Sequence, residues 1–222
     1  MCGRFTLIPG AEEIAAYYGA EPAALQVPRF NAAPTQEIAA AVHDGENIRL
    51  GLLRWGLIPS FAKDSSGGAK MINARAETID TKPSFRQLLT RRRCLIPADS
   101  FYEWKRASDG TKQPMRIQLK NRTLFSFAGL WDRWEHDGAV IQSCTIITTE
   151  ANDVMAPVHH RMPVIMPKEQ EAVWLDRSLQ DPSTLKKLLV PYTSEDMEMY
   201  PVSRYVNKPV HDDKRCIARM EE

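Results

Sequence analysis

The sequence has no apolar run that approaches the roughly 20 residues of a membrane-spanning helix. It also lacks the hydrophobic segment of a secretory signal peptide, because Pro9, Glu12 and Glu13 interrupt the region where that segment would lie. Both absences argue against secretion and against a membrane partner. We therefore expect a cytoplasmic protein.

Cysteine is scarce and widely spaced: the four cysteines are Cys2, Cys94, Cys144 and Cys216, and none forms a C-x-x-C pair. This spacing argues against a zinc site, offers no disulfide framework and fits a reducing compartment. The formal net charge is only +1, so the chain has no global basic field that would attract nucleic acid. A site for a polyanion must therefore come from a local cluster of arginines.

Linkers, composition shifts and internal repeats are also absent from the 222 residues. With 43% hydrophobic and 26% charged residues, the composition is that of an ordinary soluble globular protein. The length allows one large domain or two small ones, and nothing in the sequence marks a boundary. We therefore predict one domain over residues 1–222.

Local patterns predict a mixture of strands and helices. The helices are expected at residues 9–19, 84–89, 167–176 and 181–189. Asp44 to Asn47 supplies the turn of a hairpin between the first two strands. The strands are expected at residues 38–42, 48–55, 71–78, 115–119, 124–130 and 142–148, with a last strand and loop at 200–207.

The N-terminal stretch Met1-Cys2-Gly3-Arg4-Phe5 carries unusual chemistry. If Met1 is removed, Cys2 becomes a 1,2-aminothiol: its amine can form an imine with an aldehyde, and its sulfur can then close a thiazolidine ring. An α-amine has a pKa of about 7.7–8.0 and a free thiol about 8.5, so both nucleophiles are accessible near neutral pH. The alternative is an inert cysteine at a chance position, which is the commoner case.

The strand expected at residues 71–78 has a polar face. In an extended chain Asn73, Arg75 and Glu77 project to one side, and small or apolar residues project to the other. An amide, a guanidinium and a carboxylate on one face suit the floor of a polar site. A solvated edge strand is the alternative, and the pattern alone does not separate the two.

Two further titratable groups stand out. Glu103 lies between Tyr102 and Trp104, which makes it a candidate general acid or base, although strand alternation could instead leave it in water. His159 and His160 are adjacent, and on an extended chain they would point to opposite faces, which argues against a metal site formed by both. The alternative for either histidine is a hydrogen-bonded structural imidazole.

Glycine and proline break residues 55–61, so we expect a surface loop that carries Trp55 and Phe61, followed by a flexible tip at residues 63–70. The densest basic cluster combines Arg86 with Arg91, Arg92 and Arg93. Three adjacent arginines cannot all face one way, so at most two are expected to share a phosphate-binding surface. A solvated helix end that the cations stabilise is an equally good interpretation.

Several short stretches run in order along the whole chain and together resemble one family. They are MCGRF at 1–5, FNAAP at 30–34, RWGLIP at 54–59, INARAE at 72–77, CLIPA at 94–98, FYEW at 101–104, FAGLW at 127–131 and HHRMP at 159–163. This set resembles the SRAP (SOS response-associated peptidase) family of abasic-site processing proteins. Several blocks in the right order are far more specific than any one motif.

The resemblance implies that Cys2 forms a covalent thiazolidine with the ring-opened aldehyde of an abasic site in single-stranded DNA. It implies that Asn73 holds the α-amine and the sugar end of the adduct, that Glu103 shuttles protons, and that His159 rather than His160 protonates or positions the opened sugar. Phe61 stands where relatives often carry tryptophan. The residues expected at the DNA are Arg4, Asn31, Trp55, Phe61, Arg75 and Arg161.

We therefore expect an α+β fold: a single SRAP-like domain with a mostly antiparallel, barrel-like β core and peripheral helices. The expected function is a covalent shield for abasic sites, with no metal or cofactor, acting as a monomer on single-stranded DNA. Removal of Met1 by the protein itself is expected. Strand cleavage by β-elimination is a plausible side reaction, because an imine makes the adjacent sugar proton acidic.

Three other functions remain open at the level of the sequence. An N-terminal-nucleophile glutamine amidotransferase can also begin Met-Cys-Gly, but 222 residues show no partner domain. A conventional protease could pair Cys2 with His159. A passive single-stranded DNA-binding module would treat intact and abasic strands alike and would not need Cys2.

Overall fold

Most of the regular structure is β-strand. The computed structural model describes residues 2–220, and in them the strands are β1 (Phe5–Leu7), β2 (Arg29–Ala32), β3 (Glu37–His43), β4 (Ile48–Trp55), β5 (Asn73–Arg75), β6 (Arg93–Ala98), β7 (Ser100–Arg106), β8 (Lys112–Leu119), β9 (Phe125–His136), β10 (Ala139–Glu150), β11 (Arg161–Pro163), β12 (Ile165–Met166) and β13 (Met197–Pro201). The α-helices are α1 (Ala11–Tyr18), α2 (Arg86–Arg91), α3 (Lys168–Leu175) and α4 (Pro182–Lys187). Short 3-10 helices lie at Ser66–Lys70, Ala76–Thr78, Ser194–Asp196, Arg204–Asn207 and Lys214–Cys216.

Five strands close into a barrel. They follow the order β10-β4-β3-β6-β9, and β9 pairs with β10 again, which completes the ring. The pair β10–β4 is parallel, and the other pairs of the ring are antiparallel. Closure removes the free edges that a sheet would otherwise expose. The predicted α+β fold with a mostly antiparallel, barrel-like core is confirmed.

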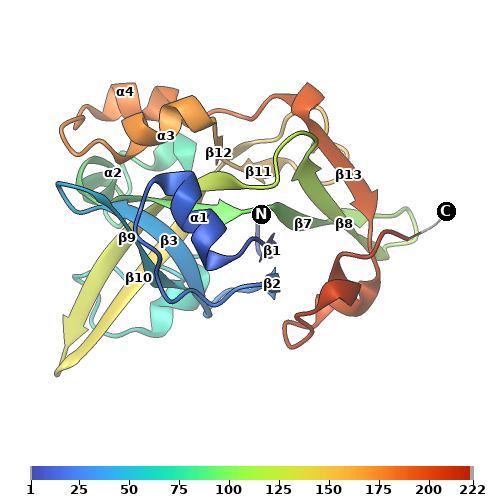
Figure 1. Ribbon diagram of the computed structural model, residues 1–222, viewed down its shortest axis with the longest axis horizontal. Helices are drawn as coiled ribbons and strands as arrows, with labels where there is room; N and C mark the ends of the chain where they lie inside the picture. Colours follow the sequence, from blue (N-terminus) through green and yellow to red (C-terminus); the bar gives the residue numbers. More distant parts are fainter. Residues whose placement is uncertain (1, 221–222) are drawn as a thin grey trace.

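A second sheet, in the order β13-β8-β7-β1-β2, is antiparallel throughout and carries the N-terminal segment. In Figure 1 its strands β7, β8 and β13 extend to one side of the molecule, while α2, α3 and α4 gather at the opposite end. There α2 and α3 contact the barrel strands β6 and β9.

The barrel interior is filled by aromatic side chains. Phe127 makes edge-to-face contacts with Phe5, Phe101 and Phe125, at centroid distances of 5.8, 6.0 and 5.4 Å. Phe5 also meets the edge of Trp55 at 5.3 Å. Such pairs stabilise a core by about 0.5–1.5 kcal/mol each beyond their buried area. This cluster joins β1 to the barrel and so fixes where Cys2 lies.

The four predicted helices and the hairpin of β3 and β4 are confirmed, with ends shifted by a few residues. The predicted strand at 71–78 is shorter, because only Asn73–Arg75 pair with β10 before the chain turns into a 3-10 helix. Within it, Ala74 and Ala76 are buried whereas Arg75 and Glu77 are exposed, as the alternation predicts.

The predictions for residues 55–70 need correction. Leu57 and Ile58 are 0% and 1% exposed, so the start of the segment is core and not surface loop. Gly56 has a φ of 131°, and a Cβ there would meet the carbonyl oxygen of Gly68 at 2.6 Å. The two backbones can approach this closely because neither glycine has a side chain. The tip predicted to be flexible, residues 63–70, therefore lies against the barrel. Within residues 2–220, no helix has the length and apolar content to span a membrane.

Candidate active site

The N-terminal segment runs along β7 and buries Cys2. Tyr102 N donates to Arg4 O at 3.0 Å, and Phe5 pairs with Phe101 in antiparallel register, so residues 2–4 continue beside β7. Cys2 is 0% exposed. Burial raises the pKa of its thiol above the ordinary range, and the nearby carboxylate of Glu103 raises it further. In this arrangement the Cys2 thiol is therefore protonated at neutral pH.

Glu103 lies on β7 and points inward. It is 4% exposed, and its neighbour Tyr102 is 0% exposed, whereas Trp104 is half-buried. The alternative in which Glu103 faces water is therefore wrong. The Tyr102 hydroxyl donates to Phe30 O at 2.8 Å, which anchors β7 against β2. Glu103 is thus a buried carboxylate on a rigid strand, adjacent to the N-terminal cysteine.

His159 is half-buried on the turn that precedes β11, and Glu103 acts on it as well as on Cys2. Burial lowers the pKa of His159 below its ordinary value, and the Glu103 carboxylate opposes that shift. The backbone N–H of Arg161 donates to His159 Nδ1 at 3.0 Å. Arg161 O lies 3.3 Å from the same nitrogen, but the N–H contact is shorter, so we assign the proton of the neutral imidazole to Nε2.

The two histidines do not point to opposite faces, as an extended chain would predict. Residues 153–158 form a turn, and the rings of His159 and His160 stack with centroids 4.4 Å apart. His160 is exposed to solvent. Among residues 2–220, no group of three or more His, Cys, Asp or Glu side chains is arranged to hold a metal ion.

A bidentate ion pair lies behind His159. Arg161 donates to both carboxylate oxygens of Glu77, at 2.6 and 2.9 Å, and to Thr148 O at 2.6 Å. Only 11% of the Arg161 side chain is exposed. The Arg161 side chain, which is predicted to contact DNA, is therefore bound to protein groups in this structure. Sequence reasoning assigned no role to Glu77 or Thr148, although Glu77 lies on the same polar face as Asn73.

Asn73 lies at the start of β5, next to Ile146 on β10. Its Nδ2 donates to Ile72 O at 3.0 Å. Its Oδ1 is buried and has no hydrogen-bond partner among the residues that the structure describes. A buried acceptor without a donor is costly, so this amide oxygen is available for an N–H or O–H that arrives with substrate or with a processed N-terminus.

Trp55 and Asn31, which are predicted to contact DNA, are both 0% exposed in this structure. Trp55 packs on Phe5, and its Nε1 donates to Ile72 O at 3.0 Å. It is a core residue that links β4 to the segment carrying Asn73.

Asn31 holds the C-terminal part of the chain. Its Nδ2 donates to the carbonyl oxygens of Val206, Lys208 and His211, at 3.0, 3.1 and 2.7 Å, and its Oδ1 accepts from Arg4 at 2.9 Å. Arg4 itself is half-buried and also donates to Val206 O at 2.8 Å. Both residues therefore bind the chain's own backbone.

Phe61 and Arg75 are exposed, as a DNA-contacting role requires. Phe61 is 67% exposed on a loop that two hydrogen bonds hold: Ser60 N donates to Asp132 at 2.7 Å and Trp134 Nε1 donates to Ala62 O at 2.8 Å. The loop thus presents an apolar ring to solvent from a fixed base.

Known proteins resemble this chain in sequence and in fold. The family model described as SOS response associated peptidase (SRAP) matches residues 1–209. Abasic site processing protein YoaM of Bacillus subtilis is 52% identical over 98% of this chain and 97% of its own length. Abasic site processing protein HMCES of Gallus gallus is 32% identical over 76% of this chain and 57% of its own length. A crystal structure of a protein from Bacteroides thetaiotaomicron superposes with a TM-score of 0.89 at 28% identity, covering 99% of this chain and all of that one. The chain therefore belongs to the SRAP family.

Proposed function

We propose that this chain processes abasic sites in single-stranded DNA by forming a thiazolidine between Cys2, once Met1 is removed, and the ring-opened sugar aldehyde. The observation that carries the proposal is that one buried carboxylate, Glu103, lies close enough to act on both Cys2 and His159. The names of the Bacillus and vertebrate relatives support the choice of substrate. Met1 itself lies outside the described residues.

The first step is imine formation. The Cys2 amine attacks the aldehyde carbon, so that a C–N bond forms and the carbonyl oxygen takes a proton. Loss of this oxygen as water leaves the imine. The free Oδ1 of Asn73 is suited to accept a hydrogen bond from the amine, and Glu103 is suited to pass a proton to the departing oxygen.

The second step closes the ring. Sulfur adds to the imine carbon, and the thiol proton ends on the nitrogen, so nothing is oxidised or reduced. Because burial and Glu103 keep the thiol protonated, the sulfur needs a base at this point. The Glu103 carboxylate is adjacent to it and can take the proton and return it to nitrogen. Over both steps one water is lost.

His159 has a donor role in this scheme. The Arg161 N–H occupies Nδ1, so Nε2–H is left to donate to the hydroxyl of the opened sugar. Glu77 and Thr148 hold Arg161 and with it the imidazole. In this proposal Arg161 positions His159, and phosphate binding falls to exposed residues such as Arg75.

The residues that are exposed to solvent suggest the path of the DNA strand in this proposal. An abasic site leaves a gap in the base stack, so bending the backbone into a narrow site costs little unstacking energy. Phe61 can stack on a flanking base, and Arg75 can contact a phosphate, without reading sequence. The peptidase in the family's name supports self-removal of Met1 by the same groups. The imine also provides a route to β-elimination, in which the 3′ phosphate leaves as the sugar proton adjacent to the imine is lost.

The test mixes processed protein with a single-stranded oligonucleotide that carries one abasic site and looks for an adduct that survives denaturation. An undamaged strand is the substrate control. Cys2→Ala removes the sulfur and so prevents closure of the thiazolidine, and Cys216→Ala is the matched control, because that thiol is buried far along the chain and donates to His211 O.

An adduct that requires both Cys2 and the lesion supports the proposal. Equal binding of both strands without an adduct would favour a passive single-stranded DNA-binding module instead. Release of ammonia from glutamine, in the absence of an adduct, would favour an amidotransferase. Cleavage of unrelated peptides by the same mixture would point to a general protease.

A further inference from the structure

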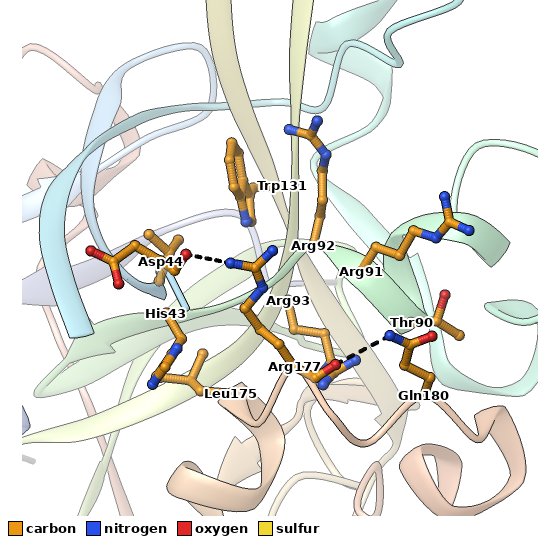
Figure 2. A pocket seen from close by; sticks show the side chains of 11 residues that line it. His43, Asp44, Thr90, Arg91, Arg92, Arg93, Trp131, Leu175, Arg177 and Gln180 are labelled. Atoms are coloured by element: carbon orange, nitrogen blue, oxygen red, sulfur yellow. Dashed lines mark hydrogen bonds between the residues drawn. The ribbon is translucent and has the colours of Figure 1, made fainter. Parts of the chain in front are cut away.

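A separate cavity of about 730 Å³ lies between the end of β3, the end of α2, the middle of β9 and the segment that follows α3. It shares no lining residue with the site around Cys2. Its lining includes four arginines and, as the one acidic residue among those lining it in residues 2–220, Asp44. Figure 2 shows Arg91, Arg92, Arg93 and Arg177 around this space.

Two of these arginines are held in place by neutral groups. Arg93 is 6% exposed and donates to the carbonyl oxygens of Leu89, Trp174 and Asp176. Arg177 donates to Asp44 O, as Figure 2 shows. Carbonyl oxygens orient a guanidinium but do not neutralise its charge. Burial accordingly lowers the pKa of Arg93 to about 10, although the Asp176 carboxylate opposes the shift.

The other two arginines are available. The Arg91 residue is exposed, and its side chain makes no hydrogen bond or ion pair with any residue from 2 to 220. Arg92 lies over the ring of Trp131 at 4.8 Å, and its Nε is 3.8 Å from Asp132 Oδ1, beyond hydrogen-bond distance. In Figure 2 both guanidinium groups extend from the end of α2 without a hydrogen bond to the other residues drawn.

The nearby carboxylates are already engaged. The Asp44 carboxylate accepts from Arg49 at 2.6 Å and from the backbone N–H groups of Glu46 and Asn47 at 2.8 Å. Asp132 accepts from Ser60 N at 2.7 Å, and Asp176 Oδ1 accepts from Ser178. The donors to Asp132 and Asp176 are neutral, so these two carboxylates keep their charge beside Arg92 and Arg93, whereas the Asp44 carboxylate is paired with Arg49. Four guanidinium groups therefore face two carboxylates, which leaves the positive charge around the cavity under-compensated, and like charges this close repel one another.

We propose that this cavity binds the phosphate groups of a nucleotide-sized ligand. Guanidinium groups match phosphate oxygens in pairs of hydrogen bonds, and four arginines line this cavity. The volume lies within the range of about 300–1,000 Å³ typical of small-molecule sites. Trp131, Val42 and Leu175 add an apolar wall for the non-phosphate part. The phosphates can come from a free nucleotide or from a nucleic acid strand, and the experiment separates these sources.

The experiment measures the affinity of pyrophosphate and of ADP by titration calorimetry at low ionic strength, with the full-length processed protein. The test variant is Arg91→Gln/Arg177→Gln. The matched control is Arg86→Gln/Arg106→Gln, which removes the same charge from exposed positions outside the cavity. Arg91→Gln alone is included, because Arg91 has no bond to lose among the described residues and the fold cannot depend on it. Thermal unfolding checks all variants.

We expect ADP and pyrophosphate to bind the native protein, and the double variant to bind at least about tenfold more weakly, since it loses two of the guanidinium groups that would make charge-assisted hydrogen bonds to the phosphates. The control pair should change the affinity by less than about twofold. Displacement of ADP by an undamaged oligonucleotide identifies strand phosphates as the source, and failure to displace it identifies a free nucleotide. Absence of binding by both probes, or equal weakening in the test and control variants, would overturn the proposal whether or not Cys2 forms an adduct.

Discussion

Trp55 and Phe61 lie close together in the sequence, but Trp55 is buried and Phe61 is exposed, and substitutions at the two positions should therefore have different effects. In Trp55→Phe the hydrogen bond to Ile72 O is lost, although that oxygen still accepts from Ile146 N at 3.0 Å. The lost bond and the partial cavity beside Phe5 should together destabilise the fold by about 2–4 kcal/mol. For a chain of this size, that lowers Tm by about 5–15 °C.

Phe61→Ala should have the opposite profile. Because the ring is 67% exposed, its removal should change stability by no more than about 0.5 kcal/mol. If Phe61 stacks on a base, affinity for single-stranded DNA should fall by about 1–3 kcal/mol, or roughly 5- to 150-fold. Val210→Ala truncates another exposed apolar side chain and is the matched control.

Thermal unfolding by calorimetry and fluorescence anisotropy with an undamaged oligonucleotide measure the two effects. The reasoning is refuted if Trp55→Phe weakens DNA binding without lowering Tm, because a core residue cannot act that way. It is equally refuted if Phe61→Ala unfolds early yet binds DNA as tightly as Val210→Ala.

Three further predictions concern the site. Glu103→Gln should slow adduct formation by about 10²–10⁴-fold. It should also lower the pKa values of Cys2 and His159, since the carboxylate raises both, and a His159 pKa measured by NMR that is the same in the variant would contradict this. Asn73→Ala should slow adduct formation while leaving affinity for undamaged DNA intact, and equal losses in both would remove its assigned role. Glu77→Gln should cost at most about 1 kcal/mol at neutral pH, because half of the Glu77 side chain is exposed. Arg161 holds the pKa of Glu77 below its ordinary value, so this stabilisation is full above about pH 5 and is lost as the pH falls through the folded-state pKa. The difference in unfolding free energy between the native protein and Glu77→Gln should therefore shrink at acid pH, and a difference that stays constant down to acid pH would refute the pairing.

Local sequence patterns were enough to predict the hairpin of β3 and β4. They were also enough to predict the alternation that buries Ala74 and leaves Arg75 exposed. The closed barrel could not be derived in the same way. Its closure depends on β10 pairing with its neighbour β9 and also with β4, and β4 lies far from β10 in the sequence. The family resemblance supplied that expectation.

The errors have the same origin. Trp55 looked like a loop aromatic because Gly56 follows it, but that glycine serves a close backbone contact with Gly68 and not a surface turn. The family resemblance placed Asn31 and Arg161 at the DNA, whereas in the structure each makes hydrogen bonds to partners distant in sequence, Lys208 and Glu77 among them. Such long-range partners cannot be read from spacing.

The most direct test of the central claim is the intact mass of the adduct between processed protein and an abasic single strand, recorded with and without borohydride. A thiazolidine predicts the mass of protein lacking Met1 plus DNA minus one water, unchanged by borohydride because the imine has already been closed by sulfur. An adduct that forms equally with Cys2→Ser and gains two hydrogens on reduction would be a simple imine. That result would contradict the role assigned to the Cys2 sulfur.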